Sequence, residues 1–193
     1  MLGEAWSGGV QECRAAVLVG GFGLPWQRDL DFGSRFVCCV EDFDWPEGVV
    51  VEDLSCSALL VLERLRELQP SKLIVITSRP RDEDRPGTLR RYRIDSEPPP
   101  PEEVHEHLAE AVAGTIDLEQ TLAIARYWCA IPSESVIFEV EPRDTHLGPG
   151  LSEEVASSID TVLAAVRAEL GTTPPASGSN LSNERIYAQL RAT

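Results

Sequence analysis

Short, continuous apolar runs are the clearest feature of the hydrophobic pattern. They fall at residues 15–20, 49–54, 73–77 and 136–140. Runs of this length, bounded by polar or turn residues, indicate strands buried on both faces, as in a parallel sheet. Residues 88–94 instead alternate apolar with basic positions, which favours an edge strand with one face in water. The pattern therefore predicts five strands.

Helical periodicity separates most of these runs. Residues 59–68 form an amphipathic segment that ends before Pro70, and two further helical segments cover 102–113 and 117–128. Residues 151–170 carry the clearest apolar face and predict a single long helix. Strand, helix and strand at this spacing form βαβ units, which cross over right-handedly. The chain is thus predicted to be an α/β protein: a three-layer sandwich around a mostly parallel five-stranded sheet, with a phosphorylase/hydrolase-like layout.

The length of 193 residues suits one α/β domain. Residues 1–14 precede the first strand and are assigned to an N-terminal extension. The domain is expected to cover 15–171. Residues 172–193 begin with the linker-like sequence TTPPASGSN and are predicted to be a flexible tail.

The formal net charge of −15 argues against non-specific binding to two kinds of partner. A field of this sign repels nucleic acid and anionic membranes. No apolar run approaches the roughly 20 residues that a membrane span needs. The five cysteines form no CxxC pair, and an odd count without a secretory signal indicates reduced thiols. The composition therefore predicts a cytoplasmic protein.

Candidate chemistry lies in the loop of residues 20–33, because ligands of such sheets bind beyond the carboxyl ends of the strands. Asp29 and Asp31 stand one residue apart in this loop. Two carboxylates at this spacing could hold a divalent cation. They could equally pair with Arg28 and Arg35, or cap the following helix. Spacing alone favours a structural role. No nucleophile motif accompanies them, so the sequence assigns no catalytic or substrate-binding residue.

Three pairs of segments, taken in chain order, carry a resemblance to a known family: 17–24 (VLVGGFGL) with 29–35 (DLDFGSR), 73–77 (LIVIT) with 86–88 (PGT), and 139–142 (EVEP) with 150–152 (GLS). Their order and spacing resemble those of the hydrogenase maturation proteases over roughly residues 15–170. These endopeptidases remove a C-terminal extension from the large subunit of nickel–iron hydrogenases once nickel is installed.

The resemblance also implies where a metal would be held. In the family an acidic residue, an aspartate and a histidine converge on the metal, thought to be the substrate's own nickel. The matching positions here are Leu30, Thr77, and Ile116 or Gly114. None is a good nickel ligand, since nickel prefers imidazole, carboxylate or thiolate. At the ligand positions, this chain departs from the family.

A shift of register would supply other ligands. The first loop is two residues longer than the family pattern, so Asp31 or Asp29 could take the place of Leu30, and Asp117 could replace the histidine. These three aspartates are the candidate metal ligands. No comparable substitute stands beside Thr77.

The resemblance leads to two functional hypotheses. The first is a hydrogenase maturation protease-like protein that acts on or binds the large subunit of a nickel–iron hydrogenase. The second is a pseudoenzyme: a non-catalytic adaptor or chaperone of maturation that has lost the metal site. The expected partner is the large subunit or another maturation factor. No permanently bound cofactor is expected, only the nickel of the substrate if a metal site survives.

Overall fold

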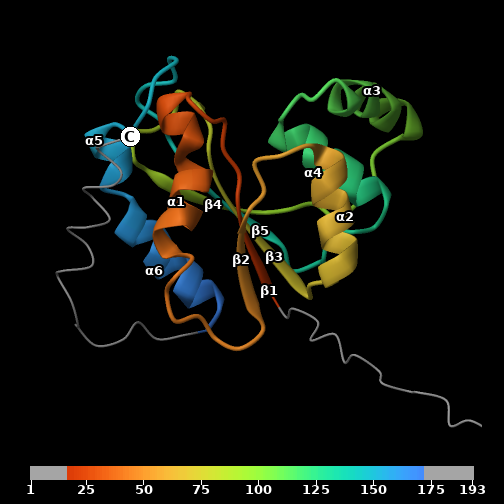
Figure 1. The fold of residues 1–193 in the computed structure, drawn as a ribbon, viewed down its shortest axis with the longest axis horizontal. Helices are drawn as coiled ribbons and strands as arrows, with labels where there is room; N and C mark the ends of the chain where they lie inside the picture. Colours follow the sequence, from red (N-terminus) through yellow and green to blue (C-terminus); the bar gives the residue numbers. More distant parts are fainter. Residues whose placement is uncertain (1–16, 172–193) are drawn as a thin grey trace, which may run out of the picture.

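One mixed sheet runs through the computed structural model, which describes residues 17–171 (Figure 1). The extension predicted at 1–14 and the tail predicted at 172–193 lie outside the described residues. The strand order is β2-β1-β3-β5-β4, with β4 antiparallel to β5 and the other pairs parallel. The strand bounds are β1 Val17–Gly21, β2 Val49–Asp53, β3 Lys72–Ser78, β4 Leu89–Arg93 and β5 Val136–Val140. The predicted fold class is confirmed.

Burial along the strands follows the hydrophobic pattern with one exception. The apolar runs of β1, β3 and β5 lie in the interior of the sheet and are almost entirely buried. The alternating strand β4 lies at an edge, as predicted. The run at 49–54 was predicted to be buried on both faces, and this is wrong. It forms β2, the opposite edge strand, whose residues are only half-buried or exposed.

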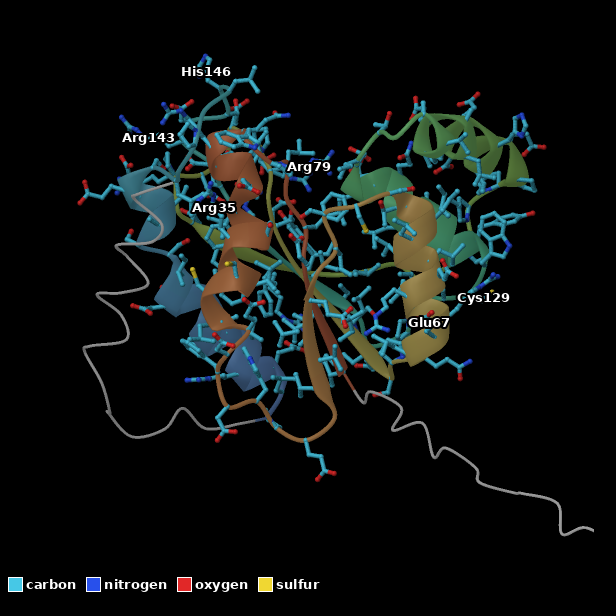
Figure 2. The ribbon with its side chains drawn as sticks, viewed as in Figure 1. Arg35, Glu67, Arg79, Cys129, Arg143 and His146 are labelled. Atoms are coloured by element: carbon cyan, nitrogen blue, oxygen red, sulfur yellow. The ribbon has the colours of Figure 1, made fainter. Side chains whose placement is uncertain are left out.

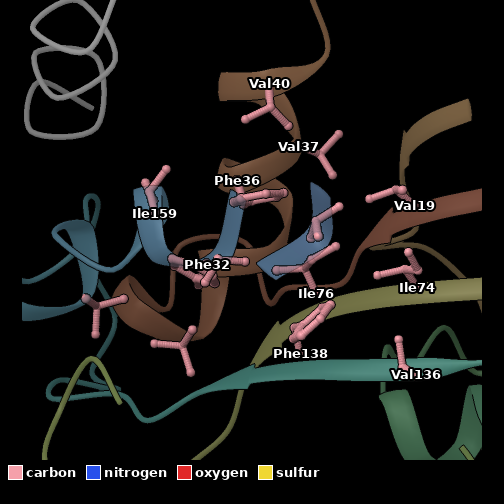
Figure 3. Close-up of a cluster of buried hydrophobic side chains, with 14 residues drawn as sticks. Val19, Phe32, Phe36, Val37, Val40, Ile74, Ile76, Val136, Phe138 and Ile159 are labelled. Carbon is pink, nitrogen blue, oxygen red and sulfur yellow. The ribbon is translucent and has the colours of Figure 1, made fainter. Parts of the chain in front are cut away.

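Helices cover both faces of the sheet and give three layers (Figure 1). Their bounds are η1 Arg28–Asp31 (a 3-10 helix), α1 Phe32–Val40, α2 Ala58–Leu68, α3 Pro101–Val112, α4 Leu118–Tyr127, α5 Glu153–Ala156 and α6 Ile159–Glu169. Phe32 and Phe36 of α1 pack with α5 and α6 against one face, in the cluster of Figure 3. On the other face, α2 and α4 pack on Leu73 and Val75 of β3, and α3 packs on α2 and α4. Across residues 17–171, no helix is both long and apolar enough to cross a membrane.

The single helix predicted over 151–170 is interrupted, so that prediction is wrong in this detail. The segment forms α5 and α6, separated by Ser157 and Ser158. The Ser157 hydroxyl donates to the carbonyl oxygen of Glu154 (2.8 Å), and the Ser158 hydroxyl donates to that of Val155 (2.7 Å). Such side-chain bonds compete with the helical backbone bonds. The apolar face continues across the break, which is why periodicity alone does not reveal it.

An ion-pair cluster joins the end of α6 to the sheet. The Glu169 carboxylate accepts from Nζ of Lys72 (2.5 Å) and from two guanidinium nitrogens of Arg91 (2.9 and 3.1 Å). The hydrogen bond from Arg91, followed by the bond and charge of Lys72, lowers the pKa of Glu169 from its usual 4.5 to about 2. The carboxylate therefore holds the last turn of α6 against β3 and β4.

Removing this carboxylate is expected to destabilise the fold in a pH-dependent way. A lowered pKa contributes stability above the unfolded value, and that contribution is lost as pH falls from 4.5 towards 2. Glu169→Gln should therefore lower the free energy of unfolding by about 1–2 kcal/mol at pH 7 and by much less near pH 2. Urea denaturation at both pH values measures the difference. Glu134→Gln, which breaks an exposed pair with Arg93 (2.8 Å), is the matched control. An equal effect of the two variants at pH 7 would contradict the assignment.

Candidate functional site

A cavity of about 150 Å³ opens where β1 and β3 end and α4 begins. Strand β1 pairs with β2 on one side and with β3 on the other, so the chain changes direction across the sheet at this point. Such a switch point is where open α/β sheets bind ligands. The cavity is lined by Phe22, Gly23, Leu24, Leu30, Thr77, Ser78, Arg79, Pro80, Ile116, Asp117, Leu118 and Glu119.

The loop after β1 forms the first wall. Its two leucines are held together by a hydrogen bond from the backbone N–H of Leu24 to the carbonyl oxygen of Leu30 (2.9 Å). The N–H of Gly23 donates to the hydroxyl of Ser55 (2.9 Å), which ties the loop to the segment after β2. A Cβ at Gly23 would lie 3.0 Å from the backbone of Asp31, so the loop closes tightly on itself. This closure places two aliphatic side chains on the cavity wall.

The end of β3 and the start of α4 form the other walls. Thr77 is the second-last residue of β3 and is 4% exposed. Ile116 and Leu118 flank Asp117, the N-cap residue of α4. The Asp117 carboxylate accepts from the backbone N–H of Gln120 (2.8 Å), which satisfies a free donor of the first helical turn. The start of α4 is thereby fixed against the sheet end.

All three positions that the family resemblance marks as metal ligands line this one cavity. Leu30 comes from the first loop, Thr77 from β3 and Ile116 from the segment before α4. The sequence left the third position open between Ile116 and Gly114. Gly114 follows α3 with φ +88°, and a Cβ added there would meet no atom within 4 Å. Of these two residues, only Ile116 lines the cavity.

Asp29 serves the scaffold. It is fully buried, and its carboxylate accepts from the backbone N–H groups of Arg143 (2.9 Å), Asp144 (2.8 Å) and Ser152 (2.6 Å). The hydroxyl of Ser152 is a fourth donor at 2.8 Å. Arg28, one of the partners considered from the sequence, instead pairs with the Asp144 carboxylate at 3.3 Å. Asp29 thus joins the loop after β1 to the segment that leads into α5.

Asp31 pairs with Arg35, one of the alternatives left open by the sequence. Its carboxylate lies 2.9 Å from Nε of that residue, one helical turn along. Burial raises the pKa of Asp31, and the arginine partly offsets this. Neither Asp29 nor Asp31 lines the cavity, whereas Asp117 does. Within residues 17–171, no group of three or more His, Cys, Asp or Glu side chains is placed to hold a metal ion. The three candidate aspartates, Asp29, Asp31 and Asp117, therefore each have different partners and do not converge on one point.

Two charged pairs near the cavity were not singled out from the sequence. Arg79 and Glu119, both in the cavity lining, form an ion pair, and the hydrogen bond from Arg79 lowers the pKa of Glu119. Buried Glu139 of β5, the neighbour of Thr77 in the sheet, accepts twice from Arg81 (2.9 and 3.1 Å). The place of Arg79 directly after β3 could have marked it as a residue of the site. Its partner Glu119 lies 40 residues further along the chain, so the pair could not be anticipated from spacing.

Comparison with solved structures identifies the fold. A hydrogenase 2 maturation peptidase from Thaumarchaeota archaeon is 25% identical, with a TM-score of 0.59, and the match covers 81% of this chain and 99% of that one. The chain has the fold of the hydrogenase maturation proteases. The hydrogenase maturating endopeptidase HybD from E. coli has the same fold at 23% identity, with a TM-score of 0.59, over 80% of this chain and 91% of its own.

The maturation-protease fold is retained despite wide sequence divergence. HycI from Thermococcus kodakarensis, a [NiFe] hydrogenase maturation protease, shares it at 11% identity, with a TM-score of 0.53, over 82% of this chain and 94% of that one. No protein-family profile matches this chain, and no curated protein matches it by sequence. The fold is therefore better preserved than the residues that it carries.

The cavity does not fit a nickel ion. Leu30 and Ile116 offer only hydrocarbon, and Thr77 offers a neutral hydroxyl, whereas nickel prefers imidazole, carboxylate or thiolate. Of the two carboxylates in the lining, that of Asp117 caps α4 and that of Glu119 pairs with Arg79. The walls of this cavity are largely apolar and offer nickel no set of ligands.

Proposed function

We propose that this protein acts in the maturation of nickel–iron hydrogenases by acting on or binding the large subunit at the cavity between β1, β3 and α4. One observation carries the proposal: the three positions marked by the family resemblance, far apart in sequence, line a single cavity at the switch point of the sheet. The match to the archaeal maturation peptidase, which covers 99% of that chain, supports it.

A second candidate is a non-catalytic adaptor or chaperone of maturation, binding the large subunit or another maturation factor. The chemistry of the cavity supports this candidate, because its walls supply no ligand set for a metal. In either case the only metal involved would be the nickel of the substrate, with no permanently bound cofactor. A cytoplasmic location is part of the proposal. The free thiols of Cys38, Cys39, Cys56 and Cys129 are consistent with it.

An incubation with purified large-subunit precursor tests the proposal. We expect the protein to co-purify with the nickel-loaded precursor, and Ile116→Arg, which places a charge in the cavity, to weaken that binding at least tenfold. Leu60→Arg is the matched control, because Leu60 is 57% exposed on α2 and outside the cavity lining. Failure of the wild-type protein to bind or shorten any large-subunit precursor would rule out the proposed function.

Mass spectrometry of the same mixture separates the two candidates. A shortened large subunit, with cleavage abolished by Asp31→Ala, would establish the protease and give Asp31 a role in it. A stable complex with the uncleaved precursor would establish the adaptor. The Asp31→Ala variant needs a thermal-unfolding control, because it also removes the ion pair with Arg35.

A further inference from the structure

Apolar side chains make up much of the cavity wall, and they determine which groups it can bind. Its wall includes the side chains of Phe22, Leu24, Leu30, Ile116 and Leu118. A cavity of about 150 Å³ has room for an apolar group of about the size of benzene. A leucine, isoleucine or phenylalanine side chain carries a group of that size. Apolar side chains thus stand at two of the three positions where the family resemblance implies a metal ligand, Leu30 and Ile116.

Exposed apolar side chains continue the surface beside the cavity. Trp26 is 67% exposed on the loop whose ends carry Leu24 and Leu30, and Leu147 is 81% exposed on the loop after β5. The two loops are joined by backbone bonds from Gly148 N–H to the carbonyl oxygen of Trp26 (2.8 Å) and from Asp29 N–H to that of Asp144 (3.1 Å). A polypeptide bound at the cavity would have these two exposed side chains within the neighbouring loops to cover.

The backbone at the exposed tryptophan is in a left-handed conformation. Trp26 has φ +64° and Arg28 has φ +43°. Residues other than glycine seldom adopt such left-handed backbone values. Such strain persists where surrounding contacts enforce it. Figure 2 shows Arg79, a cavity residue, at the same end of the molecule as Arg143 and His146, which belong with Leu147 to the loop after β5. The loop that carries Leu147 therefore lies at the end of the molecule where the cavity opens.

We infer that this cavity binds one apolar side chain of the hydrogenase large-subunit precursor, so that recognition does not depend on nickel. The inference rests on the proposed function and names what the site recognises. A free small molecule would fill the cavity but leave Trp26 and Leu147 uncovered, whereas a polypeptide inserts one side chain and covers its surroundings. The Arg79–Glu119 pair in the cavity lining offers charged partners to the polar backbone of such a segment.

Binding of the precursor in its nickel-loaded and nickel-free forms tests the inference. Calorimetry of the wild-type protein should give dissociation constants for the two forms within about threefold of each other, since an apolar contact is indifferent to the metal. Leu30→Trp and Ile116→Trp fill the cavity and should weaken both interactions at least tenfold. Leu60→Trp, an equal change at an exposed site outside the cavity, should bind as the wild type does.

The other possible binding results distinguish failure of the inference from failure of the proposed function. Binding of only the nickel-loaded form would overturn the inference and leave the proposed function standing. Equal binding by both cavity variants and the wild type would also overturn it, provided that circular dichroism shows folded variants. Binding of neither form by the wild type would instead reject the proposed function. The cavity is then tested directly by titrating benzene and following the methyl NMR signals of Leu30 and Ile116. Signals that stay unshifted would reject an apolar site altogether.

Discussion

Replacing Asp29 by alanine is expected to lower the free energy of unfolding by about 3–5 kcal/mol. The carboxylate is fully buried and accepts four hydrogen bonds, three of them from backbone N–H groups. Without it these donors stay inside the protein without a partner, and each such group costs about 1–3 kcal/mol. Urea denaturation followed by circular dichroism measures the loss.

The position of Asp29 makes this effect larger than that of a surface carboxylate. Asp144→Ala is the matched control, because its carboxylate is partly exposed and pairs with exposed Arg28 and His146. That change should cost far less than Asp29→Ala, because solvent screens an exposed ion pair. Asp29→Asn should lie between the two variants, since its amide oxygen can still accept some of the bonds. If Asp29→Ala proved as stable as Asp144→Ala, the buried network would not join the two loops as described.

Replacing Gly33 by alanine is the second change with a large expected effect. Gly33 lies in the first turn of α1, where a Cβ would come within 2.3 Å of the carbonyl oxygen of Ile76 and 2.4 Å of the backbone N and O of Phe22. Those atoms belong to the sheet end and cannot move aside as a flexible side chain can. Helix α1 would have to shift from the sheet, so we expect a loss of at least about 3 kcal/mol.

The neighbouring residue supplies the control for this prediction. Ser34→Ala lies on the same helix and removes one hydrogen bond to Asp53 (2.6 Å), which should cost about 1 kcal/mol or less. Thermal unfolding of both variants gives the comparison. Equal melting temperatures would mean that α1 does not approach β1 and β3 as closely as the structure shows. A soluble but destabilised Gly33→Ala protein should also bind the precursor less well, because the displaced loop carries Leu30.

The pairing of acidic residues shows how far spacing can be used to predict the site. Asp31 and Arg35 are four residues apart, one turn of the helix that begins with Phe32, so their ion pair could be anticipated. The partners of Asp29 lie 114 to 123 residues along the chain. No local pattern connects residues so distant in sequence. From the sequence, Asp29 and Asp31 were equivalent candidates; only the structure separates a local ion pair from a buried joint between loops.

The sequence by itself determined the strands, most of the helices and the fold class, because burial imposes a period on apolar residues that is readable locally. It also carried the family resemblance and the absence of good metal ligands at Leu30, Thr77 and Ile116. Only the tertiary structure decided that Ile116 rather than Gly114 faces the cavity, that Asp29 joins two distant loops, and that β2 lies at an edge. These three features depend on which segments of the chain meet in space. Packing between distant segments does not change the spacing of apolar residues within either segment, so the hydrophobic pattern does not reveal it.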